Sequence, residues 1–128
     1  MPVRVDDINY GGHLGNDAVL SLLQEARLRL LATHGFSEMD VDGVGMIMVD
    51  AAVEYKAEAF YGEMLRIEVG VNEFTSTGCD FVYRITKADG KEVARAKTGI
   101  AFFDYTRRKI VSVPEKFRAL MVSGREDA

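Results

Sequence analysis

The first clear pattern of apolar residues along the chain has the spacing of an α-helix. Its members recur at intervals of three and four residues, which places them on one side of a helix; they are Val19, Leu22, Leu23, Ala26 and Leu30. Asn16 is a suitable N-cap, because its side-chain oxygen can accept from free amides of the first turn. Asp17 puts negative charge where the helix dipole favours it, and Gly35 can end the helix in a left-handed conformation. The pattern predicts a helix from about Asn16 to Thr33, with Leu23 in the core.

Further along the chain, apolar and polar residues alternate with the period of a β-strand that has one buried face. The apolar members of three such segments are Val53 and Tyr55, then Leu65, Ile67, Val69 and Val71, then Phe81, Tyr83 and Ile85. Asp89-Gly90 is a hairpin-turn signal, and it leads into a long strand, Glu92–Phe103. A short last strand is expected at Ile110–Val113. Pro114 should end it and start a short helix, Glu115–Met121.

One long helix followed by antiparallel strands predicts an α+β fold. A sheet that wraps around one long central helix would bury the apolar face of each. A chain of 128 residues suits one domain, 1–128.

The charge and cysteine content narrow the classes of partner. The formal net charge of −4 argues against nucleic acid or an anionic membrane surface as the main partner. Cys79 is the single cysteine, so an intrachain disulfide is impossible, which suits a reducing cytoplasm. No apolar run reaches the roughly 20 residues that span a bilayer. The first ten residues also lack the basic and then apolar pattern of a signal peptide. We therefore expect a cytoplasmic protein with no membrane partner.

The sequence offers no motif for a metal or a redox cofactor. It has two histidines and one cysteine, and no HExxH spacing. It also lacks a GxGxxG, a P-loop and a GxSxG motif. We expect no metal and no cofactor, and chemistry that does not use a serine nucleophile.

The segment before the predicted helix carries a more specific pattern. It contains Asp7, Asn9, Gly12, His13 and Asn16, and the helix then continues with Glu25-Ala26-Arg27. This order resembles the opening of hotdog-fold thioesterases like 4-hydroxybenzoyl-CoA thioesterase. Tyr61-Gly62 between two strands and the late Pro114-Glu115 match the same family, so the resemblance covers nearly the whole chain.

The resemblance implies a hotdog fold, in which an antiparallel sheet wraps around one long central helix. It implies hydrolysis of an acyl-CoA, or a related thioester, to free acid and thiol. It also implies a homodimer or homotetramer with its sites between subunits. The chain departs from the family at Asn9, where the second aspartate of a D-x-D pair commonly supplies the catalytic carboxylate. Asparagine cannot act as a base or as a carboxylate nucleophile, so another residue must take that role, or the reaction differs.

Thioester hydrolysis needs donors for the developing oxyanion and a carboxylate or base that activates water or attacks. Backbone amides around Gly15, Asn16 and Asp17 can supply the donors, because amides of the first helical turn have no partner within the helix. Gly12 and Gly15 leave room for the substrate to approach the backbone closely. Gly12, Gly15, Asn16 and Glu25 are therefore the candidate substrate-binding residues.

The candidate catalytic residues are Asp17, Asp7, Asn9 and His13; Glu25, two turns beyond Asp17 on the predicted helix, is a further candidate for the carboxylate. We favour Asp17 slightly over Asp7, because Asp17 begins the helix whose amides should hold the oxyanion, with Asn9 positioning water or the thioester carbonyl. Structural explanations stand beside these: Asp17 is equally well explained as a helix-start charge, and Asp7 by turn hydrogen bonds. His13 can be a general acid or base near neutral pH or a residue that organises the loop.

Some other residues have simpler explanations. Glu25 most simply pairs with Arg29 four residues later. Cys79 should be inert, because no histidine or second cysteine lies near it in the sequence. Met46 and Met48 are expected in the sheet core or in an interface. Arg107, Arg108 and Lys109 are expected to be solvated, although this run could reach CoA phosphates.

Two other functions stay open at this stage. Asp7-Ile8-Asn9 with His13 faintly resembles the Asp-x-Asn-Pro-x-His motif of hotdog hydratases, but the proline is absent and the histidine comes one residue late. A non-catalytic acyl-thioester binder is the third possibility, and the missing aspartate at Asn9 motivates it.

Overall fold

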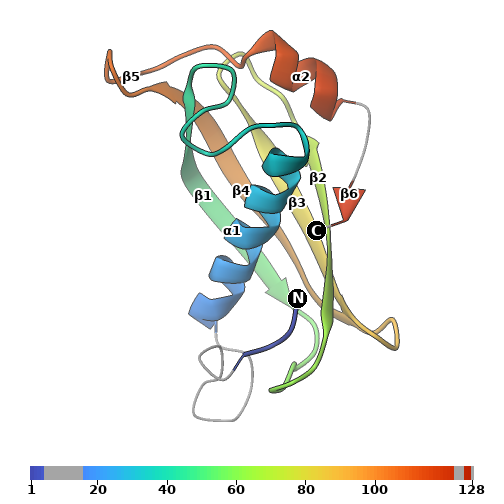
Figure 1. The fold of residues 1–128 in the computed structure, drawn as a ribbon. Helices are drawn as coiled ribbons and strands as arrows, with labels where there is room; N and C mark the ends of the chain where they lie inside the picture. The colour runs from blue at the N-terminus through green and yellow to red at the C-terminus, as the bar shows by residue number, and fades with distance from the viewer. Residues whose placement is uncertain (5–15, 123–125, 128) are drawn as a thin grey trace.

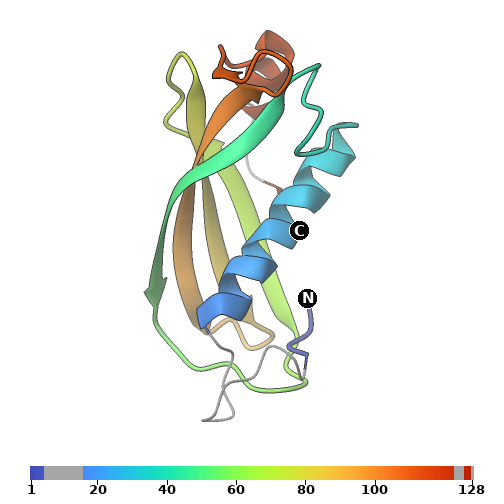
Figure 2. The ribbon, with the colours of Figure 1, turned by 90° about the vertical axis from the view of Figure 1, so that its left-hand side faces the viewer.

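The computed structural model describes residues 1–4, 16–122 and 126–127 of the chain. Its elements, in chain order, are α1 (Asn16–Thr33), β1 (Gly45–Tyr55), β2 (Leu65–Asn72), β3 (Gly78–Lys87), β4 (Glu92–Asp104), β5 (Lys109–Ile110), α2 (Glu115–Met121) and β6 (Glu126–Asp127). The strands pair antiparallel in the order β1-β4-β3-β2-β6, and β5 pairs with the end of β4. Helix α1 lies on one face of this sheet and α2 lies near one end (Figures 1 and 2). The predicted α+β class is confirmed.

Both helices have the predicted bounds, and the end of α1 shows why. Gly35 has a φ of 78°, a left-handed conformation that glycine adopts without steric cost. The amide of Phe36 donates to the carbonyl of Leu31, and the amide of Gly35 donates to that of Ala32. These bonds close the helix in the Schellman arrangement. The predicted last strand is displaced: β5 is Lys109–Ile110, and residues 111–113 lie outside a strand.

The core lies between α1, α2 and the facing side of the sheet. Leu22, Leu23 and Ala26 on α1 are almost fully buried. The alternating residues of β2 and β3 are buried opposite one another, as in the pairs Ile67↔Ile85 and Val69↔Tyr83. From α2, the ring of Phe117 contacts four other aromatic rings, those of Phe36, Phe74, Phe81 and Phe102. The one-sided burial predicted for β2 and β3 is confirmed.

Strand β1 departs from this pattern: Val53 packs partly buried against the core as predicted, whereas the predicted burial of Tyr55 is wrong. Val53 is only half-buried and Tyr55 is 47% exposed. Both residues pair with β4 positions of the face that α1 covers, Ala96 and Ala94. The reason is tertiary: β1 is the last strand of the sheet, and the backbone of α1 comes closest to β2. The flank of β1 on the α1 side is therefore left largely uncovered.

A β-bulge divides β1 into two parts. The register with β4 shifts between Met48 and Asp50, and the Asp50 carboxylate accepts from the amide of Gly99 at 3.0 Å. A Cβ at Gly99 would lie 2.5 Å from the same carboxylate oxygen. Glycine at position 99 therefore leaves room for the Asp50 carboxylate to bond the backbone of β4 beside the bulge. The bulge changes the direction of β1 at this point.

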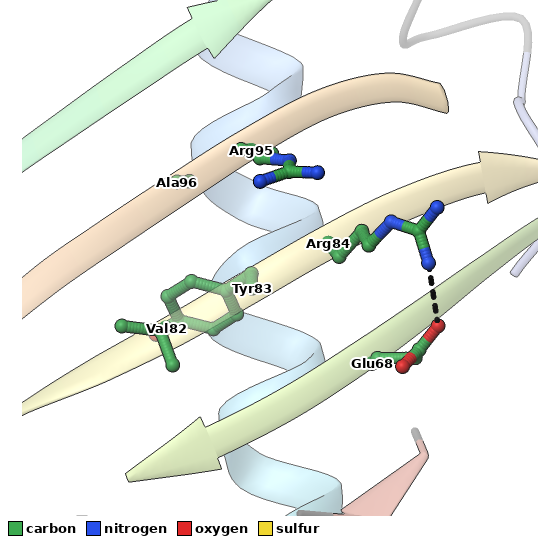
Figure 3. Close-up of a pocket in the computed structure, with 6 residues that line it drawn as sticks. All are labelled: Glu68, Val82, Tyr83, Arg84, Arg95 and Ala96. Carbon is green, nitrogen blue, oxygen red and sulfur yellow. Dashed lines mark ion pairs between the residues drawn. The ribbon is translucent and has the colours of Figure 1, made fainter. Parts of the chain in front are cut away.

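The other face of the sheet carries charged side chains in rows. Arg84 of β3 lies directly opposite Arg95 of β4, an arrangement of like charges that is unfavourable by itself. Glu92 accepts from Nε of both arginines, at 2.7 and 2.8 Å, and Arg84 also pairs with Glu68 at 3.6 Å (Figure 3). A shallow hollow of about 440 Å³ lies among these side chains. Each arginine is matched by a carboxylate, so this face has the character of a solvated surface.

Within the described part of the chain, neither helix has the length and apolar content needed to cross a membrane.

Leu23→Ala should lower the free energy of unfolding by about 2–5 kcal/mol, because it leaves a cavity in the core. Leu23 is 0% exposed, whereas Leu28 on the same helix is 39% exposed. Leu28→Ala is therefore the matched control and should change stability by no more than about 0.5 kcal/mol. Urea denaturation of both variants measures the difference. Equal losses would show that the buried side of α1 is wrongly assigned.

The hydrogen bonds from Arg84 and Arg95 to Glu92 should make the stability of the fold depend on pH in the acid range. Hydrogen bonds from Arg95 and Arg84 lower the pKa of Glu92 from 4.5 to about 2. A carboxylate with a lowered folded-state pKa stabilises the fold above its unfolded pKa, and this stabilisation is lost as the pH falls through the folded value. Glu92→Gln should therefore flatten the loss of stability between about pH 4.5 and pH 2, measured by urea denaturation at a series of pH values. Glu73→Gln, at an exposed position between β2 and β3, is the comparison variant, and an unchanged slope in Glu92→Gln would contradict the assignment.

Candidate functional site

A cleft lies beside α1, on the side toward β1. Its volume is about 430 Å³, within the range of small-molecule sites, roughly 300–1,000 Å³. Helix α1, the loop after it, β1 and β4 all contribute to its lining, which consists of Leu20, Ser21, Gln24, Arg27, Glu38, Met39, Met46, Met48 and Thr98. The cleft therefore combines apolar walls with a few polar groups, the usual composition of a ligand site.

The floor of the cleft contains the buried, charged side chain of Arg27, which has several hydrogen-bond partners. Arg27 is 5% exposed. Its Nε donates to Glu38 Oε2 at 2.9 Å, and its Nη1 donates to the hydroxyl of Tyr83 at 2.9 Å. That hydroxyl lies 2.7 Å from Oγ1 of Thr98. Among the described residues, every buried side-chain nitrogen and oxygen has at least one hydrogen-bond partner, so no buried polar atom of this network is left unpaired.

Burial and charge determine the protonation of this network. Burial alone would lower the pKa of the Arg27 guanidinium, but its contacts with Tyr83 and Glu38 outweigh burial, and the pKa is raised. Burial also raises the pKa of the Tyr83 phenol, although Arg27 and Thr98 oppose the shift. Arg27 is thus a permanent cation, and Tyr83 is a neutral donor or acceptor near neutral pH. Neither residue can serve as a general base there.

The walls and rim of the cleft are open to ligand. Met46 is buried, whereas Met48 and Met39 are 50% and 67% exposed. Methionine side chains are flexible and polarisable, and they adapt to different apolar groups. Above Arg27, the Gln24 amide reaches Glu38 Oε1 at 3.4 Å, which is a weak hydrogen bond. The amide and the carboxylate therefore lie side by side in a lining that also contains the three methionines.

The predicted site residues are only partly within the described chain. Asp7, Asn9, Gly12, His13 and Gly15 lie outside it. Asn16 and Asp17 begin α1 as predicted, so the backbone amides of these two residues belong to a helix start. The side chains of these two residues lie outside the described part, and the roles of all seven residues stay predictions.

Other predicted residues can be placed. Glu25 pairs with Arg29 at 3.2 Å, and both side chains are about half exposed. Glu25 is absent from the cleft lining, and its substrate-binding role also stays a prediction. Cys79 is buried, and burial raises the pKa of its thiol to about 12, in accord with the expected inertness. Arg107 pairs with Asp104 at 2.8 Å in the exposed turn between β4 and β5.

Sequence reasoning missed the role of Arg27 and of its partner Glu38. Arg27 entered the sequence argument only as the last residue of the Glu25-Ala26-Arg27 motif. A signal was present: Arg27 follows Leu23 by four residues and precedes Leu30 by three, so it lies on the apolar side of the helix. A charged residue at such a position needs a partner. The pattern could not say that Glu38, in a loop, would supply it.

Comparisons with known proteins now identify the family. The profile of the thioesterase-like superfamily matches residues 3–121. The acyl-CoA thioester hydrolase YbgC of Escherichia coli O157:H7 is 26% identical over 122 residues, which cover 92% of this chain and 91% of the relative. A putative esterase of Aquifex aeolicus is 30% identical over 95 residues, which cover 73% and 72%.

Solved structures agree on the fold. The 1,4-dihydroxy-2-naphthoyl-CoA thioesterase Slr0204 of Synechocystis superposes with a TM-score of 0.85 at 20% identity, covering 95% of this chain and 92% of that one. BH1999, a gentisyl-coenzyme A thioesterase, gives 0.84 at 16% identity, covering 95% and 97%. At these identities the likeness concerns the fold alone. The profile match over nearly the whole chain confirms the predicted resemblance, and the chain belongs to the thioesterase-like superfamily.

Proposed function

We propose that the protein hydrolyses an acyl-CoA, or a related thioester, to the free acid and thiol. The observation that carries the proposal is the cleft along α1, because it begins at Leu20, about one turn after the helix start. A thioester carbonyl at the amides of the first turn would have its acyl group directed into this space. Family membership and the thioester hydrolase among the relatives support the same reaction.

The reaction requires water to add to the thioester carbonyl and the C–S bond to break. In our proposal the amides at the start of α1 stabilise the oxyanion that forms. A carboxylate takes the proton of the attacking water, and that proton is returned to the departing thiolate. We assign this carboxylate to Asp17 rather than Asp7, with Asn9 orienting water or the carbonyl. His13 is the remaining acid–base candidate.

Glu38 is a described carboxylate near the cleft, but it is a weaker candidate for this base. It forms an ion pair with Arg27 at 2.9 Å, so one of its oxygens is already engaged with the buried guanidinium. The hydratase and the non-catalytic binder are not favoured, since the relatives that carry a function name are hydrolases or esterases. Release of free thiol from a panel of acyl-CoAs tests hydrolysis, and loss of enoyl absorbance would instead indicate a hydratase.

We also propose that the protein is a homo-oligomer, at least a dimer, in which the sheet wraps around α1 as its central helix. The uncovered part of β1 supports this, because Met48 and Val49 are 50% and 59% exposed and Ala51 and Ala52 are exposed beside them. An edge strand offers unpaired backbone groups to another strand. A second copy paired two-fold along β1 would extend the sheet, cover these apolar residues and enclose the cleft.

The proposal also covers the domain organisation, cellular location and cofactor use of the protein. Residues 1–128 act as one domain, in the cytoplasm, with the CoA thioester as substrate and no separate cofactor. A CoA complex is known for the Staphylococcus aureus protein SAV2348, which superposes with a TM-score of 0.86 at 15% identity and covers 96% of this chain and 79% of that one.

Asp17→Asn should lower thioesterase kcat by roughly 100-fold or more, the usual contribution of a positioned acid–base group, whereas Asp7→Asn should lower it far less. Asn9→Asp, which restores the family residue, should raise activity. Thiol release at saturating acyl-CoA measures all three, and circular dichroism checks folding. Full activity of Asp17→Asn, together with loss of activity in Asp7→Asn or Glu25→Gln, would show that the carboxylate is wrongly assigned.

Val49→Lys should shift the protein toward monomers, because a buried lysine at the β1 contact would lose its hydration. Val122→Lys is the control, since Val122 is 68% exposed and lies far along the chain, after α2. Sedimentation velocity at micromolar concentration measures the change. A stable, folded wild-type monomer under these conditions would refute the oligomer.

A further inference from the structure

The cleft has a direction along α1. Its helical lining residues are Leu20, Ser21, Gln24 and Arg27, which share one side of the helix over two turns. From Asn16 to Gln24 the helix rises by about 12 Å, at ~1.5 Å per residue. A thioester held at the helix start would therefore place the far end of a medium-length acyl group beside Gln24 and the Arg27–Glu38 pair.

Glu38 retains a poorly bonded oxygen at this end of the cleft. Oε2 accepts from Arg27 at 2.9 Å, whereas among the described residues Oε1 has only the 3.4 Å contact from Gln24. The Glu38 side chain is 22% exposed, in contrast to 6% for Arg27. A carboxylate oxygen accepts up to two hydrogen bonds, so Oε1 can accept from a ligand without disturbing the bond to Arg27. The exposed Gln24 amide offers a second polar partner at the same place.

We propose that this cleft binds a medium-length acyl group whose far end carries a hydrogen-bond donor such as a hydroxyl, and that Glu38 and Gln24 select it. The proposal rests on the proposed thioesterase function and deepens it. Met39, Met46 and Met48 contact the apolar stem, and the hydroxyl donates to Glu38 Oε1 while accepting from the Gln24 amide.

A plain methyl end would be disfavoured in this position. It would remove water from the Glu38 carboxylate without replacing the lost hydrogen bond, and such desolvation of a charged group is costly. Sites built to bond a substrate hydroxyl reject the analogue that lacks it more strongly than apolar pockets reject an extra methylene. The polar end therefore acts mainly by discriminating against unsubstituted chains of the same length.

The test compares octanoyl-CoA with its ω-hydroxy derivative by thiol release. We expect kcat/KM to be roughly tenfold higher for the hydroxylated substrate, as one hydrogen bond to a charged group provides. Gln24→Met and Glu38→Gln should each bring the ratio of the two kcat/KM values toward one. Glu73→Gln is the matched control for Glu38→Gln and should keep the wild-type ratio. Melting temperatures check that each variant folds.

The outcomes separate this inference from the function on which it rests. Glu38→Gln can destabilise the fold by weakening the partner of buried Arg27, so Gln24→Met, an exposed substitution, provides an independent arm. A wild-type ratio near or below one, or a ratio unchanged in folded Gln24→Met, overturns the proposed selection while hydrolysis stands. If the wild type hydrolyses neither substrate nor any other acyl-CoA, the thioesterase proposal fails, and this inference with it.

Discussion

The buried guanidinium of Arg27 is the constraint around which the cleft is built. Removing a full charge from water is expensive unless it is paired and hydrogen-bonded, and Arg27 is 5% exposed. Its partners come from separate parts of the chain, Glu38 from the loop after α1 and Tyr83 from β3, with Thr98 of β4 continuing the chain of contacts. Helix α1 cannot turn or slide over the sheet without leaving this charge unpaired. The positions of the cleft walls follow from that restraint.

The two faces of the sheet differ in how their exposed side chains interact with water. On the outer face, Glu92 bridges Arg84 and Arg95, so the charges are matched within the chain and lie at the surface. On the α1 side, the flank of β1 exposes Met48 and Tyr55, which leaves apolar surface in contact with water. Ligand binding and assembly are therefore both expected on the α1 side. The cleft lies next to the uncovered strand, so the proposed second copy would also shape it.

The local pattern of the sequence was sufficient for most elements. Both helices have the bounds that spacing and end signals predicted, because the proline and the left-handed glycine act within a few residues. The alternation in β2 and β3 correctly predicted their buried residues, since both strands are covered by helices. It failed for Tyr55 in β1, because periodicity describes which side chains share a face and says nothing about what covers that face.

The sequence by itself determined the α+β class, the helix and strand segments and the thioesterase-like family, because these depend on local spacing and on ordered motifs. It also proposed the carboxylates near the start of α1, whose roles stay predictions. Only the tertiary structure decided that Arg27 meets Glu38 and Tyr83, residues 11 and 56 positions away. It also decided that β1 is left uncovered. Such contacts depend on strand order and on the path of a loop, and both emerge from the packing of the whole chain rather than from any short stretch of it.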